Sequence, residues 1–260
     1  MQSSYMLKAQ ANQIIRSSNP KPTHVAAVFL AISVVFGLLS TYLIGSGMSY
    51  NDLMQINQHL ENGNLDYAIR YMSDYMPSAA SHGIDLLIQI VMSIVSVGFM
   101  MFLLNTIRRN EPCFGNLLDG FGMPFRIVLM NILIYLFVVL WSMLLLIPGI
   151  IASYRYRMST YLLIDHPEYS PADCIRESKR LMKGHKWELF CLDLSFIGWA
   201  LLGGIPMLGW LIRIWTTPYM GLTYALFYEQ LSGKNASHDS SHGSYDYHYS
   251  TAEDQDSQWR

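Results

Sequence analysis

The sequence predicts an all-α membrane protein, a polytopic bundle of six transmembrane helices with both chain ends in the cytoplasm. Long apolar runs recur along the chain, most of them close to the ~20 residues that a helix needs to cross a bilayer. Hydrophobic residues make up 52% of the 260 residues and charged residues only 14%, well below the roughly 25% of soluble domains. Lysine and arginine gather in alternate loops, as expected of a multi-pass protein.

The six spans define a membrane domain over residues 25–231, and we expect them at 25–45, 84–107, 127–147, 150–164, 187–204 and 209–229. Residues 1–24 precede them as a cytoplasmic segment that carries Lys8, Arg16 and Lys21. A short interfacial helix is expected within this segment, at residues 5–15. Its apolar side would consist of Met6, Ala9 and Ile14.

Residues 46–83 form the predicted outer loop. This segment carries a single basic residue, Arg70, against the acidic residues Asp52, Glu61, Asp66 and Asp74, so the positive-inside rule places it outside. Apolar residues at helical spacing, followed by Asn62-Gly63-Asn64, predict a pair of short amphipathic helices with a break between them.

The distribution of charge, rather than hydropathy, indicates that residues 127–164 contain two spans instead of one. Basic residues before 127 (Arg108, Arg109 and Arg126) and within 165–186 place both flanks inside, so an even number of crossings must lie between them. Pro148-Gly149 is the predicted turn. Five crossings with one long kinked third helix remain the alternative, but that topology puts five basic residues on the wrong side. With six crossings, 13 of the 17 basic residues lie inside.

A basic amphipathic helix is predicted over 171–183, on the cytoplasmic side. Ser170 is a typical N-cap, Pro171 suits the first helical position, and Asp173 supplies an acid in the first turn. Gly184 would end the helix. We expect the basic residues here to contact anionic inner-leaflet head groups or partner proteins of the cell envelope; they are Arg176, Lys179, Arg180, Lys183 and Lys186.

The remaining segments suggest no cofactor and no metal. Residues 232–260 are rich in Ser, His, Asp and Tyr and predict a disordered cytoplasmic tail, in which the histidines have no fixed ligand geometry. The three cysteines, Cys113, Cys174 and Cys191, form neither a disulfide framework nor a zinc motif.

The stretch Glu177-Ser178-Lys179-Arg180-Leu181-Met182-Lys183-Gly184-His185-Lys186, followed by Phe190-x-Leu192-x-Leu194-Ser195-Phe196-Ile197-Gly198-Trp199, resembles a bacterial family of integral membrane proteins. The family is the one called domain of unknown function 975, and the resemblance covers roughly residues 5–231. It implies a multi-pass protein of the bacterial cytoplasmic membrane and brings no established activity. The family is also loosely similar to the membrane domain attached to some glycerophosphodiester phosphodiesterases.

Ionisable residues at membrane depth are costly and therefore candidates for function. In the six-helix topology Asp85, Arg155, Arg157 and Arg213 fall in the outer half, and Asp193 and Glu229 in the inner half. The arginines either extend to the outer interface or, with Asp85, form a polar cavity for an anionic group.

Three classes of function follow from these features. A non-enzymatic accessory or scaffold protein of the envelope is the preferred interpretation, acting through membrane lipids and envelope partners. The alternative is a small transporter or lipid-handling protein that uses the outer arginine cluster. Because no nucleophile, base and orienting residue form a recognisable set, we assign no catalytic residues and do not expect an enzyme. The net charge of −2 excludes a globally basic nucleic-acid binder.

Overall fold

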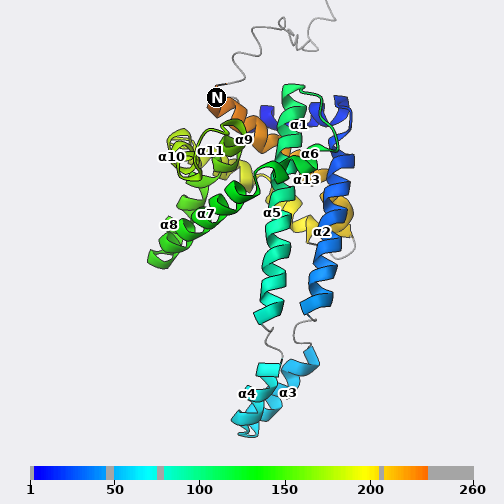
Figure 1. Cartoon of the computed structure of the whole chain (residues 1–260), viewed down its shortest axis with the longest axis vertical. Helices are drawn as coiled ribbons and strands as arrows, with labels where there is room; N and C mark the ends of the chain where they lie inside the picture. Colours follow the sequence, from blue (N-terminus) through cyan, green and yellow to red (C-terminus); the bar gives the residue numbers. More distant parts are fainter. Residues whose placement is uncertain (1–2, 45–49, 75–78, 205–207, 234–260) are drawn as a thin grey trace, which may run out of the picture.

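The computed structural model describes residues 3–44, 50–74, 79–204 and 208–233, and within these ranges all regular structure is helical (Figure 1). The predicted all-α class is therefore confirmed. In chain order the helices are α1 Ser4–Ser17, α2 Pro22–Ile44, α3 Tyr50–Glu61, α4 Leu65–Asp74, α5 Ala79–Arg108, α6 Asn116–Asp119, the 3₁₀ helix η1 Gly120–Gly122, α7 Pro124–Leu144, α8 Leu146–Tyr156, α9 Ser159–Asp165, α10 Pro171–Leu181, α11 Lys186–Leu194, α12 Ile197–Gly203 and α13 Leu208–Ser232.

Three of the described helices are long and apolar enough to cross a membrane, over Pro22–Leu43, His82–Arg108 and Pro124–Met143. They correspond to the first three predicted spans. Many large apolar side chains on them are exposed, which suits contact with lipid rather than water; examples are Val35, Leu38, Leu86, Leu87, Leu136 and Leu140. The protein thus has the helices of a membrane protein.

Helices α2 and α5 form an antiparallel pair along the long axis of the molecule (Figure 1). Near one end the rings of Phe29 and Phe99 stack with centroids 5.0 Å apart. Near the other end Ser40 donates a hydrogen bond of 2.9 Å to Asp85. Helices α3 and α4 lie beyond this second end, and Gly63, with φ +70°, turns the chain between them. The predicted pair of short helices in the loop 46–83 is confirmed.

Helices α7 and α8 form a hairpin whose turn is at Leu145, where the backbone is extended. The prediction of a turn at Pro148-Gly149 is wrong, because Pro148 fits within the first turn of α8, where a missing N–H costs nothing. Gly149 instead permits close packing, since an added Cβ would lie only 2.9 Å from the Cα of Ser142.

Two of the predicted single spans are each divided into two shorter helices. The span expected at 150–164 falls on α8 and α9, which are separated at residues 157–158. The span expected at 187–204 falls on α11 and α12, separated at residues 195–196. The last span, expected at 209–229, corresponds to the continuous helix α13, which contains Pro218.

Helices α1, α9, α10 and α11 gather around the end of α5 at which Arg108 lies, opposite α3 and α4 (Figure 1). We call this the α1 end of the molecule. Helix α1 buries Leu7, Ala11 and Ile15 and packs against α13. The predicted apolar side is therefore wrong for Met6 and Ala9, which are exposed; the buried residues instead follow a strict i, i+4, i+8 row.

The segment after α5 folds back along the same helix. Leu117 on α6 is buried, and its carbonyl group lies so close to Gly98 that an added Cβ there would be 2.6 Å from the carbonyl carbon. Gly120 makes a similar approach, with an added Cβ 3.2 Å from the backbone nitrogen of Gly98. A glycine is thus required at the point where α6 crosses α5.

Candidate functional site

A group of charged side chains joins the ends of α5, α9 and α13. Arg108 donates to both oxygens of Asp165, with Nη1–Oδ1 2.6 Å and Nη2–Oδ2 2.8 Å. The same guanidinium donates from Nε to Oε1 of Glu229 at 2.7 Å. Tyr228 donates its hydroxyl to Oδ2 of Asp165 at 2.7 Å. We call these four residues the Arg108 cluster.

The Arg108 cluster is buried, so the loss of one of its charges would destabilise the fold. The side chains of Asp165 and Glu229 are 2% and 4% exposed, and that of Arg108 is 21% exposed. Carboxylates this deeply buried are tolerated only when they are paired and hydrogen-bonded. One guanidinium fork serves both of them. The cluster therefore joins three helices, and the donors of Arg108 and Tyr228 are bonded to the carboxylates of Asp165 and Glu229.

A second polar group lies one helical turn away along α13, around Asp193 of α11. Tyr154 of α8 donates its hydroxyl to Oδ2 of Asp193 at 2.9 Å, and Tyr224 of α13 donates to Oδ1 at 2.6 Å. The guanidinium carbon of Arg157 lies 4.9 Å from the centre of the Tyr224 ring. We call these four residues the Asp193 cluster.

The two clusters are neighbours along α13, and one member of the Arg108 cluster also stacks on a buried tyrosine of α9. The rings of Tyr161 and Tyr228 stack with centroids 5.1 Å apart, and Tyr161 is buried. Tyr224 and Tyr228 are four residues apart and so lie on one face of α13. The two clusters therefore lie one helical turn apart on the same face of α13.

The structure gives the four predicted ligand residues different neighbours. Asp85 accepts hydrogen bonds from Ser40 and from Gln89. Arg213 packs beside Gly203, and an added Cβ on that glycine would lie 3.7 Å from the arginine Cγ. Arg157 lies over Tyr224, which along α13 is about 16 Å from Arg213 at 1.5 Å per residue. The structure thus does not bring these four residues into one cluster.

The backbone of Arg155 also differs in position from the sequence expectation. Its carbonyl oxygen accepts a hydrogen bond of 2.8 Å from the hydroxyl of Ser178 on α10. Arg155 therefore lies beside the basic helix, and Arg157 follows it by two residues, whereas the sequence predicts both in the opposite half of the membrane. The interruption between α8 and α9, together with the packing of α10 on α8, accounts for the difference.

Helix α10 has the capping that the sequence predicts. Ser170 and Asp173 form a reciprocal capping box, Pro171 occupies the first turn, and Gly184 follows the helix with φ +90°. Hydrogen bonds from the side chain and backbone of Ser170 lower the pKa of the Asp173 carboxyl. The chain thus defines both ends of this helix locally.

The basic residues of α10 and of the segment that follows it, up to Lys186, divide into two groups. Lys179 is directed inward, with its ammonium 5.7 Å from the ring centre of Phe137 and 5.6 Å from that of Tyr156. Arg176 pairs with Asp173, and Arg180 with Glu177, while both arginines stay largely exposed. The hydrogen bonds from Arg180 lower the pKa of Glu177. Lys183 is exposed and Lys186 half-buried.

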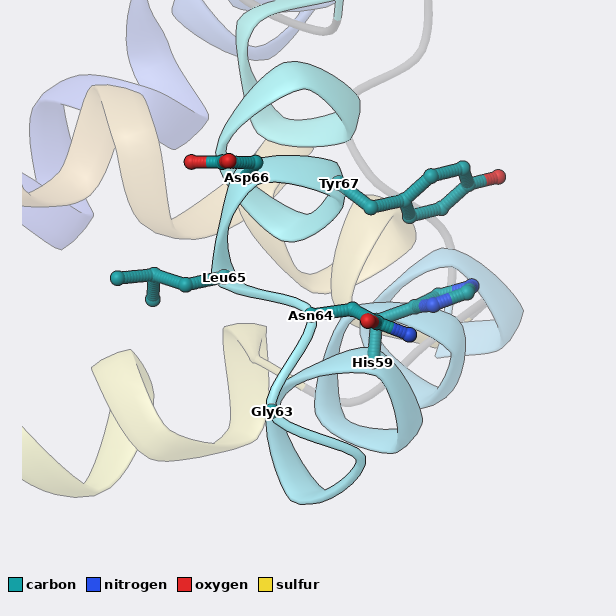
Figure 2. A pocket seen from close by; sticks show the side chains of 6 residues that line it. All are labelled: His59, Gly63, Asn64, Leu65, Asp66 and Tyr67. Carbon is teal, nitrogen blue, oxygen red and sulfur yellow. The ribbon is translucent and has the colours of Figure 1, made fainter.

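A shallow surface hollow lies at the turn between α3 and α4, and the side chains around it point in different directions (Figure 2). The rings of His59 and Tyr67 lie together, with centroids 3.9 Å apart. Across the described ranges no three metal-ligating side chains come together. The tail histidines, and the predicted disordered tail from residue 234 on, lie outside the described residues.

In the described ranges the chain is an all-helical protein, and three of its helices are long and apolar enough to cross a membrane. The chain belongs to the family described as protein of unknown function DUF975, whose sequence profile matches residues 6–235. The resemblance of the central basic stretch is thereby confirmed. No curated protein and no solved structure shows significant similarity to the chain.

Proposed function

We propose that this chain is a multi-pass protein of the bacterial cytoplasmic membrane, with six crossings and both termini in the cytoplasm. We propose further that it acts as a non-enzymatic accessory or scaffold protein of the cell envelope. The observation that carries the proposal is the exposure of Arg176, Arg180 and Lys183, two of which pair with acidic neighbours on α10, whereas the paired carboxylates of the Arg108 cluster are buried.

The distribution of charge supports the topology. The acidic helices α3 and α4 lie beyond one end of α2 and α5, and the basic helix α10 lies toward the other (Figure 1). The positive-inside rule makes the α1 end cytoplasmic. Exposed apolar side chains at the tip of the α7–α8 hairpin, among them Met143 and Leu145, suit a position within or across the bilayer.

The rigid attachment of α10 supports the scaffold role. Ser178 is buried and bonded to the backbone of α8, and Lys179 is held by two aromatic rings. The backbone of α10 is therefore anchored to α8, and the exposed Arg176 and Arg180 on the helix and Lys183 just after it are held on one segment. Each basic residue near an anionic membrane surface contributes about 1 kcal/mol of attraction, and the same array can contact an acidic protein surface. Transport through the arginine cluster has no comparable support, because the arginines face different partners.

The scaffold role can be tested by site-specific photocrosslinking in bacterial cells. A photoreactive residue at Lys183 is expected to form a discrete adduct with one envelope protein, and the adduct should disappear in the Arg176→Gln, Arg180→Gln chain. The matched control is a photoreactive residue at Leu136, which is exposed on α7 and should crosslink to lipid only. If Lys183 also yields only lipid adducts in a chain that inserts normally, the scaffold role is wrong.

A further inference from the structure

The carboxylate of Asp193 carries a negative charge that the described residues do not neutralise by an ion pair. Its two partners are the hydroxyls of Tyr154 and Tyr224, at 2.9 Å and 2.6 Å. Hydrogen bonds from neutral hydroxyls do not neutralise the charge of a carboxylate. Asp193 is half-buried, so its free lone pairs remain within reach of a bound molecule.

Arg157 is the complementary group and lies over the face of the Tyr224 ring. Its side chain is exposed, and its contact within the described chain is the face of the Tyr224 ring, at 4.9 Å. A guanidinium has five N–H donors in a planar fork that matches a phosphate. One tyrosine therefore contacts a cation through its ring face and an anion through its hydroxyl, and the described residues form no ion pair between the two.

Aromatic side chains surround this pair of charges. Phe190 meets Tyr154 edge-on at 6.0 Å, and Phe196 meets Tyr224 in the same way at 6.0 Å. Trp187 stacks on Phe190 and is exposed, as is typical of residues at the level of lipid head groups. Aromatic faces also favour ammonium groups.

We propose that α8, α11 and α13 form a binding site for the head group of a zwitterionic aminophospholipid, such as phosphatidylethanolamine. The phosphodiester binds the guanidinium of Arg157, and the ammonium binds the carboxylate of Asp193. A purely anionic head group would satisfy Arg157 but would face the uncompensated charge of Asp193. A zwitterion satisfies both groups at once, which is why the pair of charges selects it.

Lys8 lies close enough to matter for this choice. Its ammonium is 4.3 Å from the ring centre of Phe196 and donates to the carbonyl oxygen of Ser195 at 3.4 Å. This second cation would favour an anionic lipid if it, rather than Asp193, determined selectivity. The comparison of phosphatidylethanolamine with phosphatidylglycerol therefore decides between the two.

The test is lipid retention by the full chain purified in a non-ionic detergent, measured by native mass spectrometry with dioleoyl phosphatidylethanolamine or dioleoyl phosphatidylglycerol. We expect phosphatidylethanolamine to bind more tightly. Arg157→Gln should weaken it about tenfold or more, the loss expected for a charge-assisted contact. The matched control, Arg155→Gln, removes a guanidinium two residues away and should change nothing. Asp193→Asn should remove the preference for phosphatidylethanolamine.

Equal or tighter binding of phosphatidylglycerol to the unmodified chain, or equal effects of Arg157→Gln and Arg155→Gln, would overturn the proposal. If Arg157→Gln fails to fold, a competition experiment on the unmodified chain, in which soluble compounds displace the bound lipid, serves as the test instead. Soluble glycerophosphoethanolamine should displace the lipid, whereas inorganic phosphate at the same concentration should not. Displacement by phosphate alone would show a simple anion site. Since the assay is done in detergent, its outcome is independent of the topology and of the scaffold role.

Discussion

Replacing Arg108 with glutamine is expected to loosen the α1 end of the molecule. The change removes the guanidinium that serves two carboxylates, and it leaves Asp165 and Glu229 buried without a counter-charge. Loss of one partner of a buried ion pair costs about 3–5 kcal/mol. The side chain of Arg108 is 21% exposed, so water screens the ion pairs in part. We therefore expect a loss of stability at the lower end of this range, about 3 kcal/mol.

The assay is thermal unfolding of the purified chain in detergent, followed by circular dichroism. At about 2–4 °C per kcal/mol for a chain of this size, Arg108→Gln should lower Tm by about 6–12 °C. Arg109→Gln is the matched control, because Arg109 is exposed and next in sequence. Adding Asp165→Asn and Glu229→Gln should restore much of the loss, since the uncompensated charges are then removed.

The reasoning would be refuted if Arg108→Gln melted within about 2 °C of Arg109→Gln, a difference below 1 kcal/mol. It would equally be refuted if the neutralised triple variant were less stable than Arg108→Gln alone. In either case the ion pairs would not be what holds α5, α9 and α13 together.

Three further outcomes are expected. Gly98→Ala should destabilise the chain by about 1–3 kcal/mol in thermal unfolding, because its Cβ would press on the backbone of Leu117, whereas Gly83→Ala in the same helix meets open space and should be neutral or stabilising. Burial raises the pKa of the Cys174 thiol to about 11, so in a chain with no other cysteine it should react with a maleimide at pH 8 at least about 100-fold more slowly than an unburied thiol, until the chain unfolds. The pKa of Asp173 is lowered in the folded state, so its contribution to α10 is complete above about pH 4 and is lost as the pH falls through the lowered value. The protection of the α10 amides against hydrogen exchange, relative to their intrinsic rates at the same pH, should fall there, and should fall less in Asp173→Asn.

Local features of the fold could be predicted from the sequence. The capping of α10 depends on Ser170, Pro171 and Asp173, which are neighbours in the chain, and the structure reproduces it. The break between α3 and α4 depends on Gly63 in the same way. The membrane-length helices α2, α5 and α7 follow from composition alone.

Contacts between distant segments could not be predicted. Arg108 is separated from Asp165 by 57 positions and from Glu229 by 121, and no local pattern links them. The sequence shows each as a charge near one side of the membrane, without a partner. Likewise Gly149 is recognisable as a glycine near a turn, but its packing against Ser142 depends on how two helices cross. The hydrogen bond from Ser178 to the backbone of Arg155, which joins α10 to the end of α8, also links distant positions and has no local sequence signal.

The most direct test of the proposed topology is the accessibility of a cysteine at Leu145, the turn of the α7–α8 hairpin, in a chain whose native cysteines are replaced by serine. Leu145 is 64% exposed, whereas a side chain at Gly149 would collide with Ser142. A cysteine at Asn64, between α3 and α4, serves as the outer reference, and a chain that retains only Cys113 serves as the inner one.

Six crossings predict that a membrane-impermeant maleimide labels Leu145→Cys and Asn64→Cys from outside intact cells, and labels Cys113 only after the inner face is opened. Labelling of Leu145→Cys only from the inner face would contradict six crossings, because the tip of the α7–α8 hairpin would then lie on the inner side and neither helix would cross the membrane.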